Sequence, residues 1–193
     1  MIKIGKKLIV FMCVLSLSLI VYKNVKADND DYCSGTWSDP TSLTIQWFDS
    51  IYDYYSSTSV GFWWNTYTSN VKIASQSVGQ STNLNRDIRI KGSSTVSYWG
   101  STINYKKVLG VSVPSWTGNW SYSNIIINTN DLMKESLSLQ KKVVVHEIGH
   151  ALGLDHPSPD NSHSDIKAIM KQGDNGYYTI QSHDSANLKA KYN

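Results

Sequence analysis

Cysteine and glutamate are both rare in this chain of 193 residues. There are two cysteines, Cys13 and Cys33, and two glutamates, Glu135 and Glu147. Cys13 lies in an apolar N-terminal run that we expect to be removed, so the remaining chain has one cysteine and cannot form a disulfide of its own. The folded part therefore depends on its hydrophobic core and on any metal that it binds.

The longest apolar run covers residues 8–22, near the N-terminus. Lysines precede it, and Val25 and Ala27 place small residues ahead of a cleavage position before Asp28. The run has about 15 residues, whereas a membrane-spanning helix needs about 20. The pattern predicts a secretory signal peptide over residues 1–27 and hence a secreted, extracellular protein. The alternative is an uncleaved N-terminal anchor.

Without the predicted signal peptide, the chain has no excess of positive charge. The predicted signal peptide contains five of the 18 Lys and Arg residues and none of the 15 Asp and Glu residues, which leaves a net charge of −2 after cleavage. Because no basic patch or stripe remains, nucleic acid is not an expected partner. We expect no stable membrane anchor after signal cleavage, and we expect a monomer.

The periodicity of apolar residues predicts the order of helices and strands. Alternating or apolar runs predict strands at residues 43–47, 71–74, 87–91, 108–113 and 124–129. Helical spacing predicts helices at residues 54–67, 137–152 and 183–192. Polar stretches predict a short N-terminal lead-in at residues 28–36 and loops at residues 76–85 and 92–106. No repeat or linker divides residues 37–193, which are expected to form one domain.

The stretch HEIGHALGLDH, residues 146–156, has the spacing H-E-x-x-H-x-x-G-x-x-H. His146 and His150 are four residues apart, so a helix places both imidazoles on one face. Gly153 tolerates a positive φ and can end that helix sharply, which lets His156 return as a third nitrogen ligand. Three histidines leave one position of a tetrahedral zinc ion open, as in catalytic zinc sites.

Glu147 is placed beside the first histidine, where it can act as general base toward a water on the metal. Zinc peptidases that use a downstream glutamate as third ligand are excluded, because no glutamate follows residue 147. Asp155, Asp160 and Asp165 are alternative ligands, but His156 has the expected spacing. The pattern therefore predicts one catalytic Zn²⁺, held by three histidines.

At this motif the chain resembles the metzincin zinc endopeptidases, and it is most similar to a small bacterial matrixin. Met170, in the sequence Ala168-Ile169-Met170, resembles the methionine turn (Met-turn) that follows the third histidine in metzincins. The resemblance implies an α+β zincin fold. That fold has a twisted, mixed five-stranded sheet, three helices and an active-site cleft between an upper and a lower subdomain.

The resemblance also implies how a substrate binds. Residues 108–113 correspond to the edge strand, along which an extended peptide pairs by β-addition, and residues 171–178 form the loop that sets S1′ specificity. Mammalian matrixins hold a structural zinc and calcium in the loop before the edge strand. Here residues 92–107 contain no histidine and no acidic residue. We therefore expect no structural zinc, and the sequence does not support a calcium site.

Cys33 is a candidate for latency control. Many matrixins are kept inactive by a pro-segment cysteine that occupies the open zinc position, and the resemblance suggests this role for Cys33, although the flanking switch sequence is missing. The alternative is an exposed free thiol without a role.

The expected function is that of a secreted zinc-dependent endopeptidase acting on protein or peptide substrates. One alternative is a zinc-binding relative without activity, which the intact Glu147 disfavours. The other is a surface-binding module that uses its aromatic residues, seven Trp and twelve Tyr.

Overall fold

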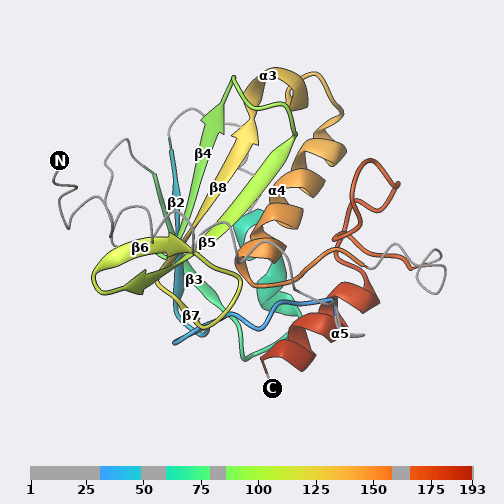
Figure 1. Ribbon diagram of the computed structural model, residues 1–193. Helices are drawn as coiled ribbons and strands as arrows, with labels where there is room; N and C mark the ends of the chain where they lie inside the picture. Colours follow the sequence, from blue (N-terminus) through green and yellow to red (C-terminus); the bar gives the residue numbers. More distant parts are fainter. Residues whose placement is uncertain (1–30, 49–59, 79–85, 158–165, 193) are drawn as a thin grey trace, which may run out of the picture.

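The computed structural model describes residues 31–48, 60–78, 86–157 and 166–192 of the chain (Figure 1). The predicted signal peptide lies outside these residues, as do Asp160, Asp165 and the first part of the helix predicted at residues 54–67. Within the described ranges, no helix is both long and apolar enough to cross a membrane.

Six strands form the main sheet, in the order β3-β2-β4-β8-β5-β6. The first four strands of that order are parallel, whereas β5 is antiparallel to both β8 and β6. The strands are β2 (Leu43–Trp47), β3 (Ile73–Val78), β4 (Ile88–Ser93), β5 (Gly100–Val108), β6 (Val111–Pro114) and β8 (Tyr122–Asn128). A separate parallel pair joins β1 (Thr36–Trp37) to β7 (Asn119–Trp120).

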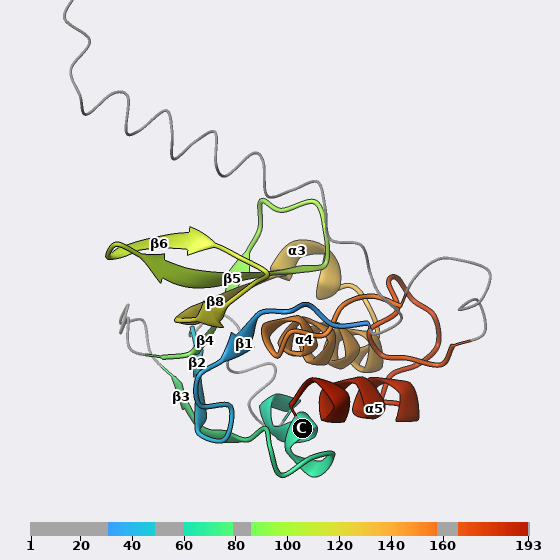
Figure 2. The same ribbon diagram turned by 60° about the horizontal axis from the view of Figure 1, so that its bottom comes forward.

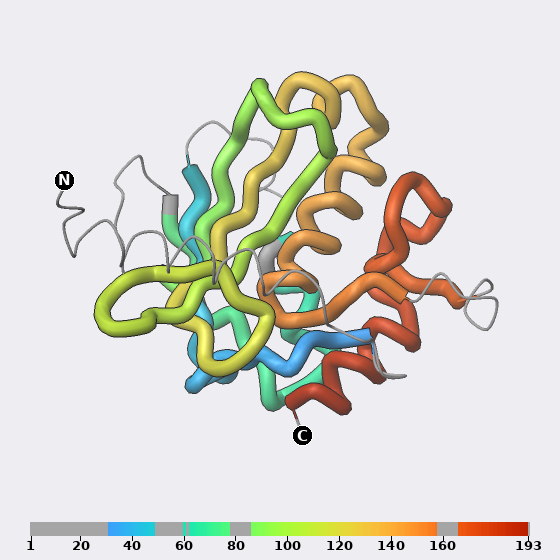
Figure 3. Tube along the Cα trace, viewed as in Figure 1, coloured from blue at the N-terminus to red at the C-terminus, as the bar shows by residue number. Residues whose placement is uncertain are grey.

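The helices are the 3₁₀ helix η3 (Val60–Thr66) and the α-helices α3 (Thr129–Leu132), α4 (Leu137–Ala151) and α5 (Ser182–Lys191). In Figure 1, α4 lies to the right of the sheet, α3 at the top and α5 at the lower right. α4 packs against β5, β8 and η3. The chain then turns away from the sheet and ends in α5, near the C-terminal end of α4 (Figure 3). The predicted α+β class is thus confirmed, and within the described residues the main sheet has one strand more than the five expected.

Helix α4 is the central element of the core, because twelve of its fifteen residues are buried. The Ser136 hydroxyl caps its N-terminus by accepting a hydrogen bond from the Leu139 N–H, which satisfies one of the free donors of the first turn. Val144 and Ile148 of α4 belong to the same hydrophobic cluster as the β-sheet isoleucines, among them Ile125 of β8. This packing fixes the helix against the sheet on which the site is built.

Most of the predicted elements are confirmed. The strands predicted at residues 43–47, 87–91 and 124–129 correspond to β2, β4 and β8, and the helices at 137–152 and 183–192 correspond to α4 and α5. The strand predicted at 71–74 begins at Ile73 and continues to Val78, so the predicted loop starts later than residue 76. Within the described residues, the helix predicted at 54–67 is the 3₁₀ helix η3.

Over residues 92–113 the prediction was wrong in part. The predicted loop at 92–106 contains most of β5, and the predicted strand at 108–113 is interrupted by a turn at Leu109 and Gly110. The inward positions of β5 are polar, which made the strand look like a loop. Thr102 and Asn104 are buried there because they have polar partners in α4. The Asn104 amide donates to the carbonyl of His150, and the one hydroxyl proton of Thr102 is shared between the backbone carbonyl and the carboxylate of Glu147.

The course of β5 leaves part of its own edge open. β5 pairs with β8 over residues 100–105 and with β6 over residues 105–108. In the described part of the chain, residues 100–103 of β5 therefore have no strand partner on the side away from β8. Residues 111–113 of the predicted edge strand do belong to β6, the last strand of the sheet, and residues 100–103 of β5 are a second stretch of open edge.

Asp184 of α5 ties the C-terminal helix to the turn at residues 168–170. Its buried carboxylate accepts hydrogen bonds from the backbone N–H groups of Ile169, Met170 and Gln181, at 2.8, 3.1 and 2.8 Å. Burial raises the pKa of this carboxyl group, and the three N–H donors act against that rise. The contact fixes the position of the turn below α4.

We predict that Asp184→Asn lowers the free energy of unfolding by about 2–4 kcal/mol, because an amide replaces one charged acceptor and turns an N–H group toward backbone donors. Urea denaturation measures the change. The control is Asp131→Asn, at an exposed position beside Lys134, which is expected to cost less than about 1 kcal/mol. Equal effects of the two variants would contradict the role of Asp184.

Candidate metal centre and active-site cleft

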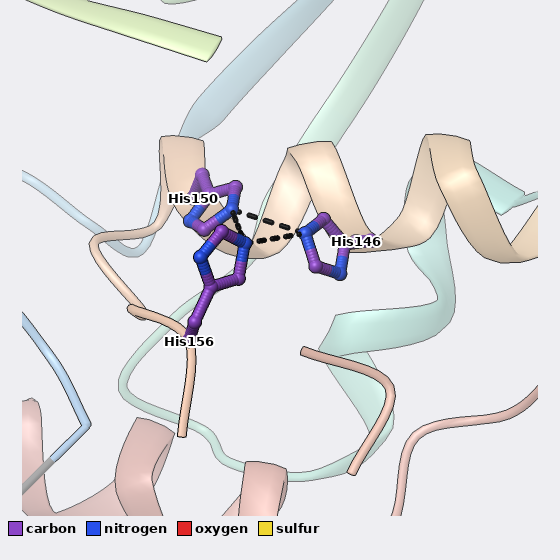
Figure 4. A group of neighbouring side chains, drawn as sticks. All are labelled: His146, His150 and His156. Atoms are coloured by element: carbon purple, nitrogen blue, oxygen red, sulfur yellow. Dashed lines mark hydrogen bonds between the residues drawn. The ribbon is translucent and has the colours of Figure 1, made fainter. Parts of the chain in front are cut away.

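Three imidazole nitrogens converge at the C-terminal end of α4 (Figure 4). His146 and His150 are one helical turn apart, and their Nε2 atoms are 3.1 Å from each other. The Nε2 atom of His156 lies 3.1 Å from that of His146 and 3.0 Å from that of His150. A point about 2.0–2.1 Å from all three nitrogens exists above this nearly equilateral triangle, and that is the usual Zn–N distance.

The outer nitrogens decide where the imidazole protons lie. Nδ1 of His146 donates to the carbonyl of Ile169, and Nδ1 of His150 donates to the carbonyl of Leu154, both at 2.8 Å. A neutral imidazole has a single N–H, so the Nε2 atoms of these two rings carry lone pairs and cannot donate to each other. Their close approach fits a shared cation, and carbonyl partners of this kind are typical of histidines that bind a metal.

Burial favours the neutral form of all three rings. It lowers the pKa of His150 to about 4, places the pKa of His146 well below its usual value and lowers that of His156; the neighbouring imidazoles add to the effect on His146 and His150. Neutral imidazole is the form that binds metals. The chemistry of the donor set therefore fits a zinc ion.

Gly153 brings His156 back to the helix end. Its φ of 87° lies in the left-handed region, and an added Cβ would lie 2.8 Å from the Trp120 ring. The Gly153 N–H donates to the carbonyl of His150, which closes the last turn of the helix. The His156 N–H then donates to a carboxylate oxygen of Asp155 at 2.8 Å. The predicted role of the glycine matches this geometry.

Met170 lies in the core below the histidines. It is buried, and a side chain at Gly149 of α4 would collide with its sulfur atom and with the Trp64 ring. The preceding residue, Ile169, provides the carbonyl that accepts from His146. The turn predicted from the sequence therefore both packs under the helix and orients one of the histidines.

Glu147 lies on the side of α4 that faces β5. Its carboxylate oxygen Oε2 is 2.7 Å from the hydroxyl of Thr102. Burial raises its pKa to about 7, and the hydrogen bond with Thr102 acts in the opposite direction. A Cβ at Gly100 would lie 2.7 Å from Oε1 of the same carboxylate. A side chain at position 100 would therefore displace the Glu147 carboxylate from this position.

The family model described as matrixin, peptidase M10, matches residues 63–193. The chain belongs to the matrixin family. Comparison with curated proteins found no match. Membership of this family supports a zinc metalloendopeptidase, and within the described residues the group of side chains able to hold a metal is His146, His150 and His156.

The cleft of this matrixin domain runs along β5 and has a volume of about 550 Å³. The three histidines and Glu147 form part of its floor. Its other lining residues are Trp99, Gly100, Ser101, Thr102, Trp116, Lys142, Val143, Asp155, Gln172 and Gly173. Residues 171–173 form one end of the cleft. Lys142 is buried there, and its ammonium donates to the carbonyls of Lys171 and Gly173.

Three residues that line the cleft were not predicted from the sequence: Thr102, Trp116 and Lys142. Lys142 could have been found, because it stands four residues before His146 and thus on the same face of α4. Thr102 and Trp116 carry no local signal, since only the packing of β5 and of the segment after β6 against α4 brings them to the cleft.

The structure does not bring Cys33 to the histidines. The described metal-binding group does not include it, and its Sγ lies 3.9 Å from the carbonyl of Gly35. The thiol is 4% exposed, so the alternative of an exposed thiol was wrong. Burial raises its pKa, which disfavours the thiolate that a metal needs. Latency through Cys33 has no support in this conformation.

We predict that His156→Ala weakens zinc binding at least about a hundredfold, because it removes one of three ligands of a site whose binding energy is shared among few donors. Competition with a chromophoric chelator measures the affinity. The control is His183→Ala, outside the triad, where the ring bonds to Asp31. If the zinc affinity of His156→Ala were unchanged, the third ligand would be another residue, such as Asp155.

Proposed function

We propose that this matrixin is a secreted endopeptidase that uses one Zn²⁺, with His146, His150 and His156 as zinc ligands, Glu147 as general base and Met170 as the Met-turn residue. The observation that carries the proposal is the convergence of three imidazole Nε2 atoms beside a buried carboxylate in one open cleft. Family membership supports the same class of enzyme. The predicted signal peptide supports secretion.

The residues divide the chemistry of peptide hydrolysis between them. When bound, Zn²⁺ polarises the scissile carbonyl and lowers the pKa of a coordinated water. The carboxylate of Glu147 takes the proton of the attacking water and delivers it to the nitrogen of the leaving amine. Thr102 holds Oε2 of that carboxylate at 2.7 Å, so the base is already oriented before the substrate arrives.

A protein or peptide substrate fits the open edge of β5. Residues 100–103 offer backbone groups on the side away from β8, and an extended peptide can pair with them by β-addition. Trp99 and Trp116 line the cleft next to this edge and provide apolar contacts for side chains of the substrate. Lys142 and residues 171–173 bound the cleft at one end.

The alternative of an aromatic surface-binding module finds little support. Four of the seven tryptophans are buried in the core: Trp37, Trp47, Trp64 and Trp120. Trp116 is the most exposed of the others and lies in the cleft, with its ring centroid 6.5 Å from that of His150. The tryptophans of the described residues therefore serve packing and the cleft rather than a separate flat surface.

Glu147→Gln tests the proposed function. We predict that this variant keeps bound zinc but loses casein and peptide cleavage by about 10²–10⁴-fold, because the amide cannot accept the proton of the water. Zinc content by metal analysis and cleavage rates are measured on the same preparations. Removal of zinc with a chelator should abolish cleavage by the unmodified enzyme, and zinc should restore it. Cleavage that survives in Glu147→Gln would overturn the assignment.

Thr102→Val tests the orientation of the base. Valine keeps the shape but cannot hold Oε2, so we predict a fall in kcat of about ten- to a hundredfold, with KM and zinc content close to those of the unmodified enzyme. Thr102→Ser keeps the hydroxyl and should retain most of the activity. A rise in KM with unchanged kcat would contradict the role of the hydroxyl. So would an equal fall in kcat in both variants.

A further inference from the structure

The tip of the β5–β6 hairpin exposes three apolar side chains. Leu109 is 100% exposed, Val111 58% and Val108 45%. Six of the eight large hydrophobic residues exposed in the described structure lie between residues 98 and 116. The hairpin extends from the sheet on the side away from α4 and α5 (Figures 1 and 2). Exposed apolar groups concentrated in this way mark interaction sites more often than scattered ones do.

The turn at the tip is an unfavourable place for leucine. Leu109 has a φ of 50° and is the one residue other than glycine with a positive φ in the described chain. Gly110 follows with a φ of 82°, so both central positions of this two-residue turn are left-handed. Such turns favour Asn-Gly. Because the Leu109 side chain is fully exposed, no packing inside the molecule offsets its unfavourable backbone.

Positive charge accompanies the apolar tip. Lys106 and Lys107 directly precede Val108. The hairpin, residues 100–114, has these two basic residues and no acidic one. The partner of this surface is therefore expected to be anionic.

We propose that the hairpin tip docks this protein on an anionic membrane surface. Val108, Leu109 and Val111 enter the boundary between headgroups and acyl chains, while Lys106 and Lys107 contact lipid phosphates. A narrow tip with three apolar side chains offers much less than the roughly 800 Å² per partner of a stable protein interface. A bilayer needs no complementary pocket, so the shape and the charge both favour lipid over a protein partner.

Docking at this tip orients the cleft. Strand β5 carries Thr102 at the cleft and Val108 at the tip, and six residues of strand span about 20 Å. If the proposed peptidase function holds, the cleft then lies close to the membrane and favours protein segments near the lipid surface as substrates. The membrane contact itself does not depend on catalysis.

Co-sedimentation with lipid vesicles tests the proposal on the chain from Asp28 onward, in the Glu147→Gln background so that binding is read without cleavage. Vesicles of phosphatidylglycerol mixed with phosphatidylcholine are compared with pure phosphatidylcholine. We expect binding to the anionic vesicles at least about tenfold stronger, and weakening with salt. Leu109→Asn should lower that binding at least about tenfold, and the pair Lys106→Gln and Lys107→Gln by a similar factor.

Folding failure cannot explain these losses. Asparagine suits the left-handed turn better than leucine, so Leu109→Asn should unfold at the same or a higher temperature than the unmodified protein. The control Met133→Ser removes an exposed apolar side chain outside the hairpin and should bind vesicles normally. Equal binding to both vesicle types, no binding to either, or unchanged binding of Leu109→Asn would overturn the proposal. So would hairpin-dependent dimers that do not bind vesicles.

Discussion

Two neutral imidazoles repel each other when their lone pairs point together at about 3 Å, unless a cation lies between them. In His146 and His150 backbone carbonyls enforce this arrangement. The carbonyls of Ile169 and Leu154 accept the Nδ1 protons and leave both Nε2 atoms unprotonated. Each carbonyl is fixed in turn. Asp184 holds the turn that contains Ile169, and the reversal at Gly153 places Leu154. Much of the lower half of the fold thus serves to direct lone pairs at one point.

The other half of the site depends on a polar strand. β5 lies against α4 through Thr102 and Asn104, which bond to α4 carbonyls 45 and 46 residues further along the chain. These bonds replace the apolar contacts expected of a half-buried strand, and they place the Thr102 hydroxyl on the carboxylate of Glu147. The same strand carries the open edge at residues 100–103. The proposed base and the proposed substrate edge are therefore aligned by a single element.

The parts that were predicted from the sequence are those with local causes. Helical periodicity predicts that His146 and His150 share a face, and the backbone freedom of glycine predicts the reversal at Gly153. Both causes lie within the eleven residues 146–156. β5 was missed because its inward residues are polar, and their partners lie far away in sequence. The position of Cys33 was missed for a similar reason, since the Gly153 carbonyl that accepts from its N–H is 120 residues away. Periodicity describes burial against an apolar core, and it fails where a strand packs through hydrogen bonds.

The central claim is that three imidazoles, and no sulfur, hold a single zinc ion in this domain. X-ray absorption at the zinc edge of the zinc-loaded chain from Asp28 onward measures this directly. The account predicts three imidazole nitrogens at about 2.0–2.1 Å with light atoms completing the shell. A sulfur at about 2.3 Å would place Cys33 on the metal, and fewer than three imidazoles would remove one of the proposed ligands; either result would contradict the account.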